Sequence, residues 1–236
     1  MKFTLKASLI TALSTSVSNA IVLAHYTFDS GASSIDTSPY STSSDMIVRD
    51  GSVPVAHYLV STGGGNQGLH LRAADSGDHI GITSASIDLA GNDYFEFGFV
   101  ISGLAAGETI DLTSLTYESY ASSAFPNAEM GLYSDVTGYD TSSQLDHVDM
   151  TTLVNATFTP ESADLSTHTE FSGLTNGDEV YFRFYQADGG SGLSARINMI
   201  DNVVLNATIN SVPIPEPSAS CLLFLAGVAI FSRRKR

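Results

Sequence analysis

The sequence predicts an all-β protein: a single, jelly-roll-like β-sandwich with an N-terminal signal peptide and a short C-terminal transmembrane helix. Residues 21–212 show no helical periodicity of useful length, whereas runs of alternating apolar and polar residues recur. Clusters of Gly, Ser, Asp and Thr, such as STGGGNQG and ADGGSG, separate these runs and favour turns. About ten short strands at such spacing are typical of a sandwich, and the jelly roll is the sandwich that we expect.

The clearest predicted strand is Tyr94–Ile101, in which Phe95, Phe97, Phe99 and Ile101 share one face, as a period of two requires. The predicted strands, in chain order, are Ile21–Phe28, Met46–Arg49, Val55–Val60, Leu69–Arg72, His79–Ile87, Tyr94–Ile101, Thr109–Tyr117, Ala128–Tyr133, Val148–Phe158, Glu179–Tyr185 and Arg196–Ile209.

The first 20 residues have the pattern of an export signal. Lys2 and Lys6 precede a mildly apolar stretch, and Ser18-Asn19-Ala20 supplies small residues where a signal peptidase cuts. Signal peptidase and the export machinery are therefore expected partners. Cleavage after Ala20 is predicted, and cleavage after Ala24 is the alternative.

The C-terminal end predicts a marginal membrane helix over about residues 217–232. The run Ala219–Phe231 has thirteen residues, and as a helix it spans about 20 Å against a hydrocarbon core of roughly 30 Å. Four basic residues follow it and predict a cytoplasmic end, which leaves the body exported. They are Arg233, Arg234, Lys235 and Arg236.

The same end carries a motif. Pro215-Glu216-Pro217, then an apolar helix containing Gly227, then the basic cluster, resembles the PEP-CTERM sorting signal of bacterial exopolysaccharide-forming species. The match covers about residues 213–236. Proline at positions 215 and 217 prevents the motif from continuing a helix, which keeps it accessible to a protease.

The resemblance implies a route for the protein. Proteins with this signal are processed by a membrane protease called exosortase, so the body would be held transiently at the inner membrane. It would then be cut near Pro215-Glu216-Pro217 and released to the cell surface or extracellular matrix. The alternative is a permanent tail anchor that is never cut.

The body, residues 21–212, is predicted to be one domain. Its fragments AHYTFD and RINMIDNVVLNATI are similar to the first and last strands of the jelly-roll domains, related to carbohydrate-binding modules and LamG-like sandwiches, that often precede PEP-CTERM tails. This likeness implies that the N- and C-terminal strands pair and that a short linker, Ser211-Val212-Pro213, leads to the tail.

Charge and cysteine content exclude several functions. The chain has 25 acidic and 10 basic residues, which argues against nucleic-acid binding because phosphate contacts depend on Lys and Arg. The basic residues away from the two ends are Arg49, Arg72, Arg183 and Arg196. Cys221 is the single cysteine, so an intramolecular disulfide is impossible.

The sequence predicts a non-enzymatic body. H-E-x-x-H, G-x-S-x-G and P-loop patterns are absent. Carboxylates are plentiful, but no motif selects a catalytic pair from them. The cofactor that the sequence points to is a structural Ca²⁺, which would tie the first strand to the last through oxygen ligands. The candidate ligands are Asp29, Asp36, Asp201 and Asn202.

The alternative function is a carbohydrate-binding module for exopolysaccharide, delivered by the same tail. The chain has no Trp but ten Tyr, and tyrosine rings offer a flat apolar face with a polar edge. Tyr117, Tyr120, Tyr133 and Tyr139 lie near predicted loops and are the candidate platforms.

Overall fold

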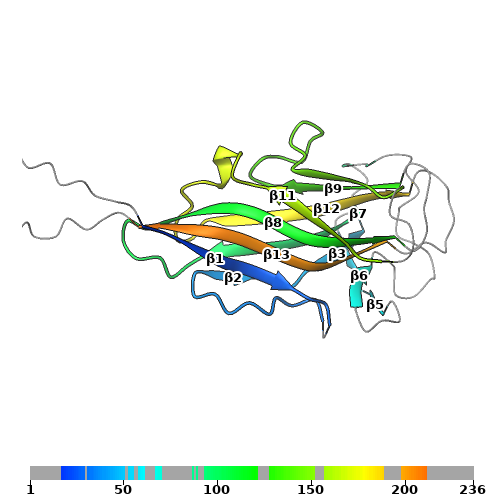
Figure 1. Cartoon of the computed structure of the whole chain (residues 1–236), viewed down its shortest axis with the longest axis horizontal. Coiled ribbons are helices and arrows are strands. Elements are labelled where there is room, and N and C mark those ends of the chain that lie inside the picture. The colour runs from blue at the N-terminus through cyan, green and yellow to red at the C-terminus, as the bar shows by residue number, and fades with distance from the viewer. Residues whose placement is uncertain are drawn as a thin grey trace, which may run out of the picture.

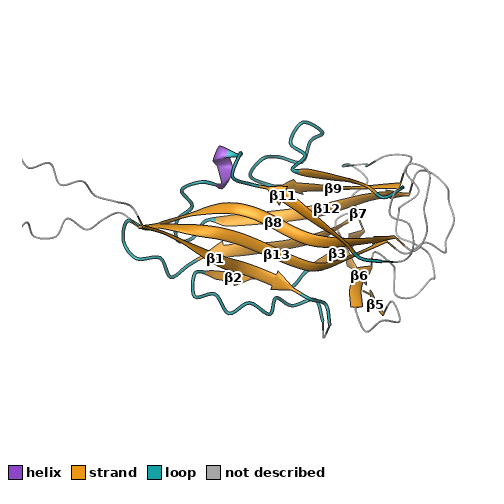
Figure 2. Cartoon of the chain, in the orientation of Figure 1, coloured by secondary structure: helices purple, strands orange, loops and turns teal. Residues whose placement is uncertain are grey.

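Two antiparallel sheets packed face to face form the protein in a computed structural model (Figure 1). The structure describes residues 17–29, 31–50, 53–55, 58–61, 67–70, 87, 89, 93–121, 128–151, 157–188 and 198–211. Strands dominate these residues, and the helix among them is a single 3₁₀ turn, Thr169–Phe171 (Figure 2). The prediction of an all-β sandwich is confirmed.

The first sheet has six strands in the order β11-β8-β13-β6-β5, with β1 also paired to β13. Its strands are β1 (Val17–Tyr26), β5 (Tyr58–Ser61), β6 (Gln67–His70), β8 (Thr109–Ala121), β11 (Thr159–Asp164) and β13 (Asn198–Ser211).

The second sheet has seven strands in the order β10-β9-β12-β7-β3-β4, with β2 also paired to β7. Its strands are β2 (Ser41–Ser43), β3 (Ile47–Asp50), β4 (Val53–Val55), β7 (Asp93–Ile101), β9 (Ala128–Ser134), β10 (Asp146–Asp149) and β12 (Glu179–Asp188). The main strands therefore run β1-β13-β8-β11 in one sheet and β7-β12-β9-β10 in the other. This order is the jelly-roll arrangement of two Greek keys.

Alternating side chains build the core between the sheets. Phe97 of β7 stacks on Phe182 of β12 at 5.4 Å between ring centroids, and Tyr117 of β8 meets Phe184 of β12 edge-on at 4.9 Å. Tyr26 of β1 lies 5.2 Å from Phe97. Because the contacts of Tyr117 and Tyr26 join strands of different sheets, burial of the aromatic faces holds the layers together.

A bulge bends strand β1 at the edge of the first sheet. The pairing of β1 with β13 shifts register between Val22 and Ala24, so Leu23 is the extra residue. The hydroxyls of Ser41 and Ser43 donate to the Leu23 carbonyl oxygen at 2.7 and 3.1 Å. Since Ser41 and Ser43 belong to β2, these bonds connect the edges of the two sheets.

The N- and C-terminal strands pair, as predicted. Val17 is the register partner of Ser211, and the ladder continues to Tyr26 opposite Val203. Figure 1 shows β1 beginning where β13 ends, at one end of the sandwich. The predicted signal-peptide boundary after Ala20 therefore falls within β1, four of whose residues precede it.

One predicted strand, Val148–Phe158, is wrong. The structure ends β10 at Asp149 and places a turn at Met150 and Thr151, so the strand does not continue there, and the next strand that the structure describes, β11, begins at Thr159. The sequence of β11, TPESAD, contains Pro, Glu and Asp, which β-propensity disfavours. It is found at the edge of its sheet, where Pro160 is tolerated.

Two further predictions cannot be compared with the structure. Nearly all of the predicted strand His79–Ile87 lies outside the described residues, as does the whole of 213–236 with its predicted membrane helix. Among the residues that the structure does describe, no helix has the length and apolar character needed to span a membrane.

Candidate functional site

Two of the four predicted calcium ligands lie next to each other at a bulge in β13. Asp201 is opposite Glu118 of β8, and the register shifts between Asp201 and Val204. Asn202, in this bulge, has a left-handed φ of 48°, which Asn tolerates better than most residues. Its backbone amide donates to Asp201 Oδ1 at 2.7 Å, and its side-chain amide donates to Glu118 Oε2 at 3.2 Å.

Asp201 is a buried acid among other acids. Its side chain is 4% exposed. Burial is the main cause that raises the pKa of Asp201 to about 7, and the negative charges of Glu118 and Asp29 raise it further, against the lowering effect of the Asn202 amide. The structure therefore brings Asp29 close enough to act on Asp201, as the predicted pairing of the chain ends requires.

Asp36 has a different role. Its Oδ2 accepts a hydrogen bond of 2.8 Å from the Ser38 amide and so closes a local turn. Within the described part of the chain, no group of three or more His, Cys, Asp or Glu side chains is arranged to hold a metal ion. The calcium site stays a prediction.

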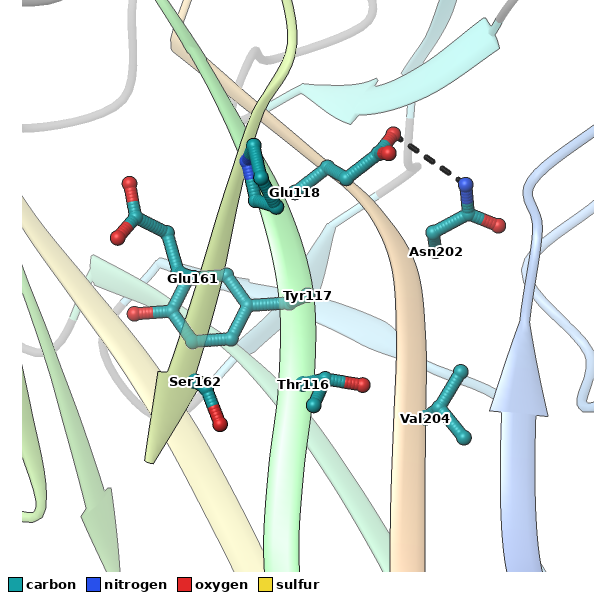
Figure 3. Close-up of a pocket in the computed structure, with 8 residues that line it drawn as sticks. Thr116, Tyr117, Glu118, Glu161, Ser162, Asn202 and Val204 are labelled. Atoms are coloured by element: carbon teal, nitrogen blue, oxygen red, sulfur yellow. Dashed lines mark hydrogen bonds between the residues drawn. The ribbon is translucent and has the colours of Figure 1, made fainter. Parts of the chain in front are cut away.

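A shallow groove of about 430 Å³ lies beside this bulge, over β8, β11 and β13. Its lining consists of Thr116, Tyr117, Glu118, Pro160, Glu161, Ser162, Asn202 and Val204 (Figure 3). Figure 3 shows the Glu118 carboxylate directed toward Asn202 and that of Glu161 directed away on the other side of Tyr117. The two acids therefore do not face a common point, as an acid and base acting on one bond would.

Tyr117 does not offer the groove an aromatic platform. The side chain is 2% exposed and packs on Phe184 in the core. Its hydroxyl donates to Asp146 Oδ2 at 2.8 Å, and burial raises the pKa of Tyr117, with the Asp146 charge adding to this effect.

The outer surface of the second sheet carries a different arrangement, which we call the tyrosine–arginine face. Three register pairs between β12 and β7 define it: Tyr181 with Gly98, Arg183 with Glu96, and Tyr185 with Tyr94. These residues alternate with the core residues Phe95, Phe97, Phe99, Phe182 and Phe184, so the same alternation that builds the core places them outward.

Glu96 holds two arginines on this face. Arg183 Nε donates to Oε2 at 2.8 Å, and Arg49 Nη2 donates to Oε1 at 3.2 Å. The Glu96 side chain is 9% exposed, so the ion pairs lie in a poorly solvated place. Burial disfavours the charged form and by itself lowers the pKa of Arg183. The hydrogen bonds to Tyr185 and Glu96 outweigh this effect, so the pKa of Arg183 is raised overall.

Aromatic rings enclose the guanidinium group of Arg183. The carbon Cζ lies 4.2 Å from the ring centroid of Tyr94 and 4.0 Å from that of Tyr139, within the range of cation–π attraction. Tyr185 makes further ring contacts at 5.0 Å with Tyr94 and 5.5 Å with Tyr133. Burial raises the pKa of all four tyrosines, so their hydroxyls stay protonated at neutral pH.

Tyr181 occupies the open end of the tyrosine–arginine face. The side chain is 37% exposed. A Cβ atom added to Gly98 would lie 2.4 Å from Cδ1 and 2.5 Å from Cε1 of Tyr181, so the ring covers the glycine. Such a ring shields the bare backbone on one side, while the rest of the side chain meets solvent.

The structure places the four tyrosines that the sequence predicts as platforms in different environments. Tyr117 and Tyr120 lie in β8 rather than in loops, and both are buried. Tyr133 and Tyr139 pack against the tyrosine–arginine face, where Tyr133 forms a buried cluster with Tyr94 and Tyr185. Sequence reasoning did not select Tyr94, Tyr181 or Tyr185. The signal was present in VYFRFYQ of β12, where alternation places Tyr181, Arg183 and Tyr185 on one face.

The predicted sorting residues cannot be placed. Pro215, Glu216 and Pro217 and the basic cluster that ends at Arg236 lie beyond the described residues, which end at Ser211.

Comparisons with known proteins give little. No protein-family model matches the chain, and no curated protein matches it. Among solved structures, the chain is similar at 8% identity and a TM-score of 0.20 to an unassembled KI polyomavirus VP1 pentamer, covering 89% of this chain and 98% of that one. A structure of the infectious bursal disease virus Gx strain follows at 14% identity and a TM-score of 0.13, covering 94% and 73%. The fold assignment therefore rests on the strand order of the chain itself.

Proposed function

We propose that this protein is exported, carried by a PEP-CTERM sorting signal, and released to the cell surface or extracellular matrix after processing by an exosortase-type membrane protease. The sandwich is a non-enzymatic body in this proposal. The motif Pro215-Glu216-Pro217, with its apolar run and basic end, is the sequence feature behind it.

The observation that carries the proposal furthest is the position of the last strand. β13 ends at Ser211, shortly before the motif, and its last residues are held by β8: Asn210 is paired with Thr109, and the Ser211 hydroxyl donates to Glu108 Oε1 at 3.2 Å. A cut at Pro215-Glu216-Pro217 would therefore leave every described strand intact. This supports a tail that is separable from the body.

The geometry at the other end favours processing after Ala20. Ser18, Asn19 and Ala20 are exposed, whereas Leu23 and Ala24 are fully buried. Cleavage after Ala20 would remove only part of one edge strand. Cleavage after Ala24 would also remove the Leu23 carbonyl oxygen to which the Ser41 and Ser43 hydroxyls donate. The shorter body would lose core packing and the link between the sheet edges.

The experiment replaces Pro215, Glu216 and Pro217 by alanine in the native host and follows the protein in membrane, surface and medium fractions. We expect the variant to stay in the membrane fraction, because the protease no longer finds its site. Val212→Ala, just ahead of the motif, is the matched control and should be released normally. Unchanged release of the triple variant would overturn the proposal.

A further inference from the structure

The bond that signal peptidase is expected to cut lies inside a sheet. Ala20 of β1 is the register partner of Thr208 of β13, and Ile21 is the partner of Ala207. The pairing continues on both sides of this bond and keeps its register as far as Val22. A protease has to take its substrate into its own cleft as a separate segment, so it cuts a paired bond only after the strand has opened locally.

The partner strand of this bond comes from the far end of the body. β1 ends at Tyr26, whereas β13 begins at Asn198. Within the described part of the chain, β13 is the strand that pairs with residues 17–22. Because a chain is synthesised from its N-terminus onward, these residues have no partner strand until nearly the whole body has followed them.

Residues closer in sequence hold the second half of β1 instead. The hydroxyls of Ser41 and Ser43 donate to the carbonyl oxygen of Leu23. This contact lies on the C-terminal side of the bond between Ala20 and Ile21. It therefore leaves that bond accessible while the early part of the chain assembles.

We propose that docking of β13 closes the signal-peptidase site, so that cleavage after Ala20 precedes completion of this sheet and a precursor that folds first keeps its signal peptide. The inference rests on the proposed export and adds the order of its steps. The side chains of Ser18, Asn19 and Ala20 are exposed, but a peptidase also needs their backbone, which is paired with β13. The last strand of the body thus limits the time available for processing the first.

β13 is itself held in place on its other side. Thr208 is the register partner of Asp111 in β8, and the side-chain amide of Asn210 donates to Asp111 Oδ2 at 2.7 Å. Release of the bond therefore requires β1 to separate from a strand that is held by its neighbour. Leu23 and Ala24, which follow the bond closely, are fully buried and oppose this separation.

The test treats the full-length precursor with purified bacterial signal peptidase. The precursor is made by cell-free translation and folded in detergent, and cleavage after Ala20 is followed by mass. The unfolded comparison is Phe182→Asp/Phe184→Asp, which places two charges at fully buried positions far from the bond in sequence. Far-UV circular dichroism and thermal unfolding establish the state of each protein. We expect the folded precursor to be cut about tenfold more slowly, or slower still, than the unfolded variant.

A second variant loosens the partner strand and leaves the peptidase site unchanged. Thr208→Gly weakens β13 directly opposite Ala20, and we expect the folded variant to be cut about threefold faster than the folded precursor, or more. Thr116→Gly is the matched control, because Thr116 is also partly buried but pairs with Val204. This control should be cut at the rate of the unchanged precursor.

Each other outcome overturns the inference in a distinguishable way. Equal rates for the folded precursor and the unfolded variant would show that the folded strand opens freely, and would leave the proposed export intact. Absence of cleavage after Ala20 in both would remove the predicted signal-peptide boundary, and the inference with it. A folded Thr208→Gly variant cut no faster than Thr116→Gly would show that pairing with β13 does not protect the bond.

Discussion

Arg183 of β12 and Glu96 of β7 face each other across neighbouring strands, with Nε of Arg183 2.8 Å from Oε2 of Glu96. Arg49 of β3 binds the other carboxylate oxygen at 3.2 Å. Two of the four arginines in the body therefore meet at one buried acid, on the outer surface of a strongly acidic protein. This triad ties three strands of the second sheet together beside the tyrosine–arginine face.

The first prediction concerns this triad. Glu96→Gln leaves two arginines without their carboxylate in a poorly solvated place, and we expect it to lower the free energy of unfolding by about 1.5–3 kcal/mol. Urea denaturation measures the change. Glu170→Gln, at an exposed position, should change stability by less than about 0.5 kcal/mol. Equal effects of the two substitutions would contradict the role given to Glu96.

The second prediction concerns Gly98 and Tyr181. Gly98→Ala introduces a methyl group where the ring lies, so we expect it to destabilise the protein by about 1–2 kcal/mol and to displace the ring. In a Tyr181→Ala background the same change should cost much less. A double-mutant cycle measured by thermal unfolding isolates this coupling. Additive effects would mean that the ring does not cover the glycine.

The third prediction concerns Asp201, whose pKa is raised from 3.8 to about 7. The folded protein keeps this proton to a higher pH than the unfolded chain does. Tighter binding of this proton by the folded protein therefore stabilises it fully below about pH 3.8, and this contribution to the free energy of unfolding is lost as the pH rises through 7. We expect Asp201→Asn to stabilise the protein by roughly 1–3 kcal/mol at pH 8 and to have little effect at pH 4.

Unfolding of Asp201→Asn at both pH values provides the measurement. The control is Asp45→Asn, at an exposed position. Its effect on the free energy of unfolding should differ less between pH 4 and pH 8. A gain in stability at pH 4 equal to that at pH 8 would show that proton linkage is not the cause.

The fourth prediction tests the N-terminal boundary. Leu23 is fully buried at the bulge of β1, so Leu23→Ala should cost about 2–4 kcal/mol. Val22→Ala, beside it and only partly buried, should cost less than half as much in the same denaturation experiment. Similar costs for the two would remove the structural argument against processing after Ala24.

The strands that the sequence predicts well are those whose alternation carries large apolar residues. Phe95, Phe97 and Phe99 predict β7, which the structure places at Asp93–Ile101 against a prediction of Tyr94–Ile101. Strand β11 was missed because Thr159–Asp164 contributes Ala163 as its one fully buried side chain and is otherwise polar. Its position at a sheet edge depends on pairing with β8, which no local pattern encodes.

The contacts at the candidate sites likewise depend on how the strands pair rather than on local sequence. The predicted pairing of the chain ends is confirmed, because β1 and β13 are adjacent, and the negative charge of Asp29, just after β1, contributes to the raised pKa of Asp201. Glu118 joins them only through the register of β8. Likewise Glu96 and Arg183 are 87 positions apart in the chain, so their ion pair results from tertiary structure rather than from any motif.

The most direct test of the proposed sorting is the intact mass of this protein, recovered separately from the membrane, surface and medium of the native host. The account predicts a form outside the membrane that begins at Ile21 and ends near Pro215 to Pro217, with the whole of β13 retained. A C-terminus at Arg236, found in the membrane fraction alone, would contradict release and make the tail a permanent anchor.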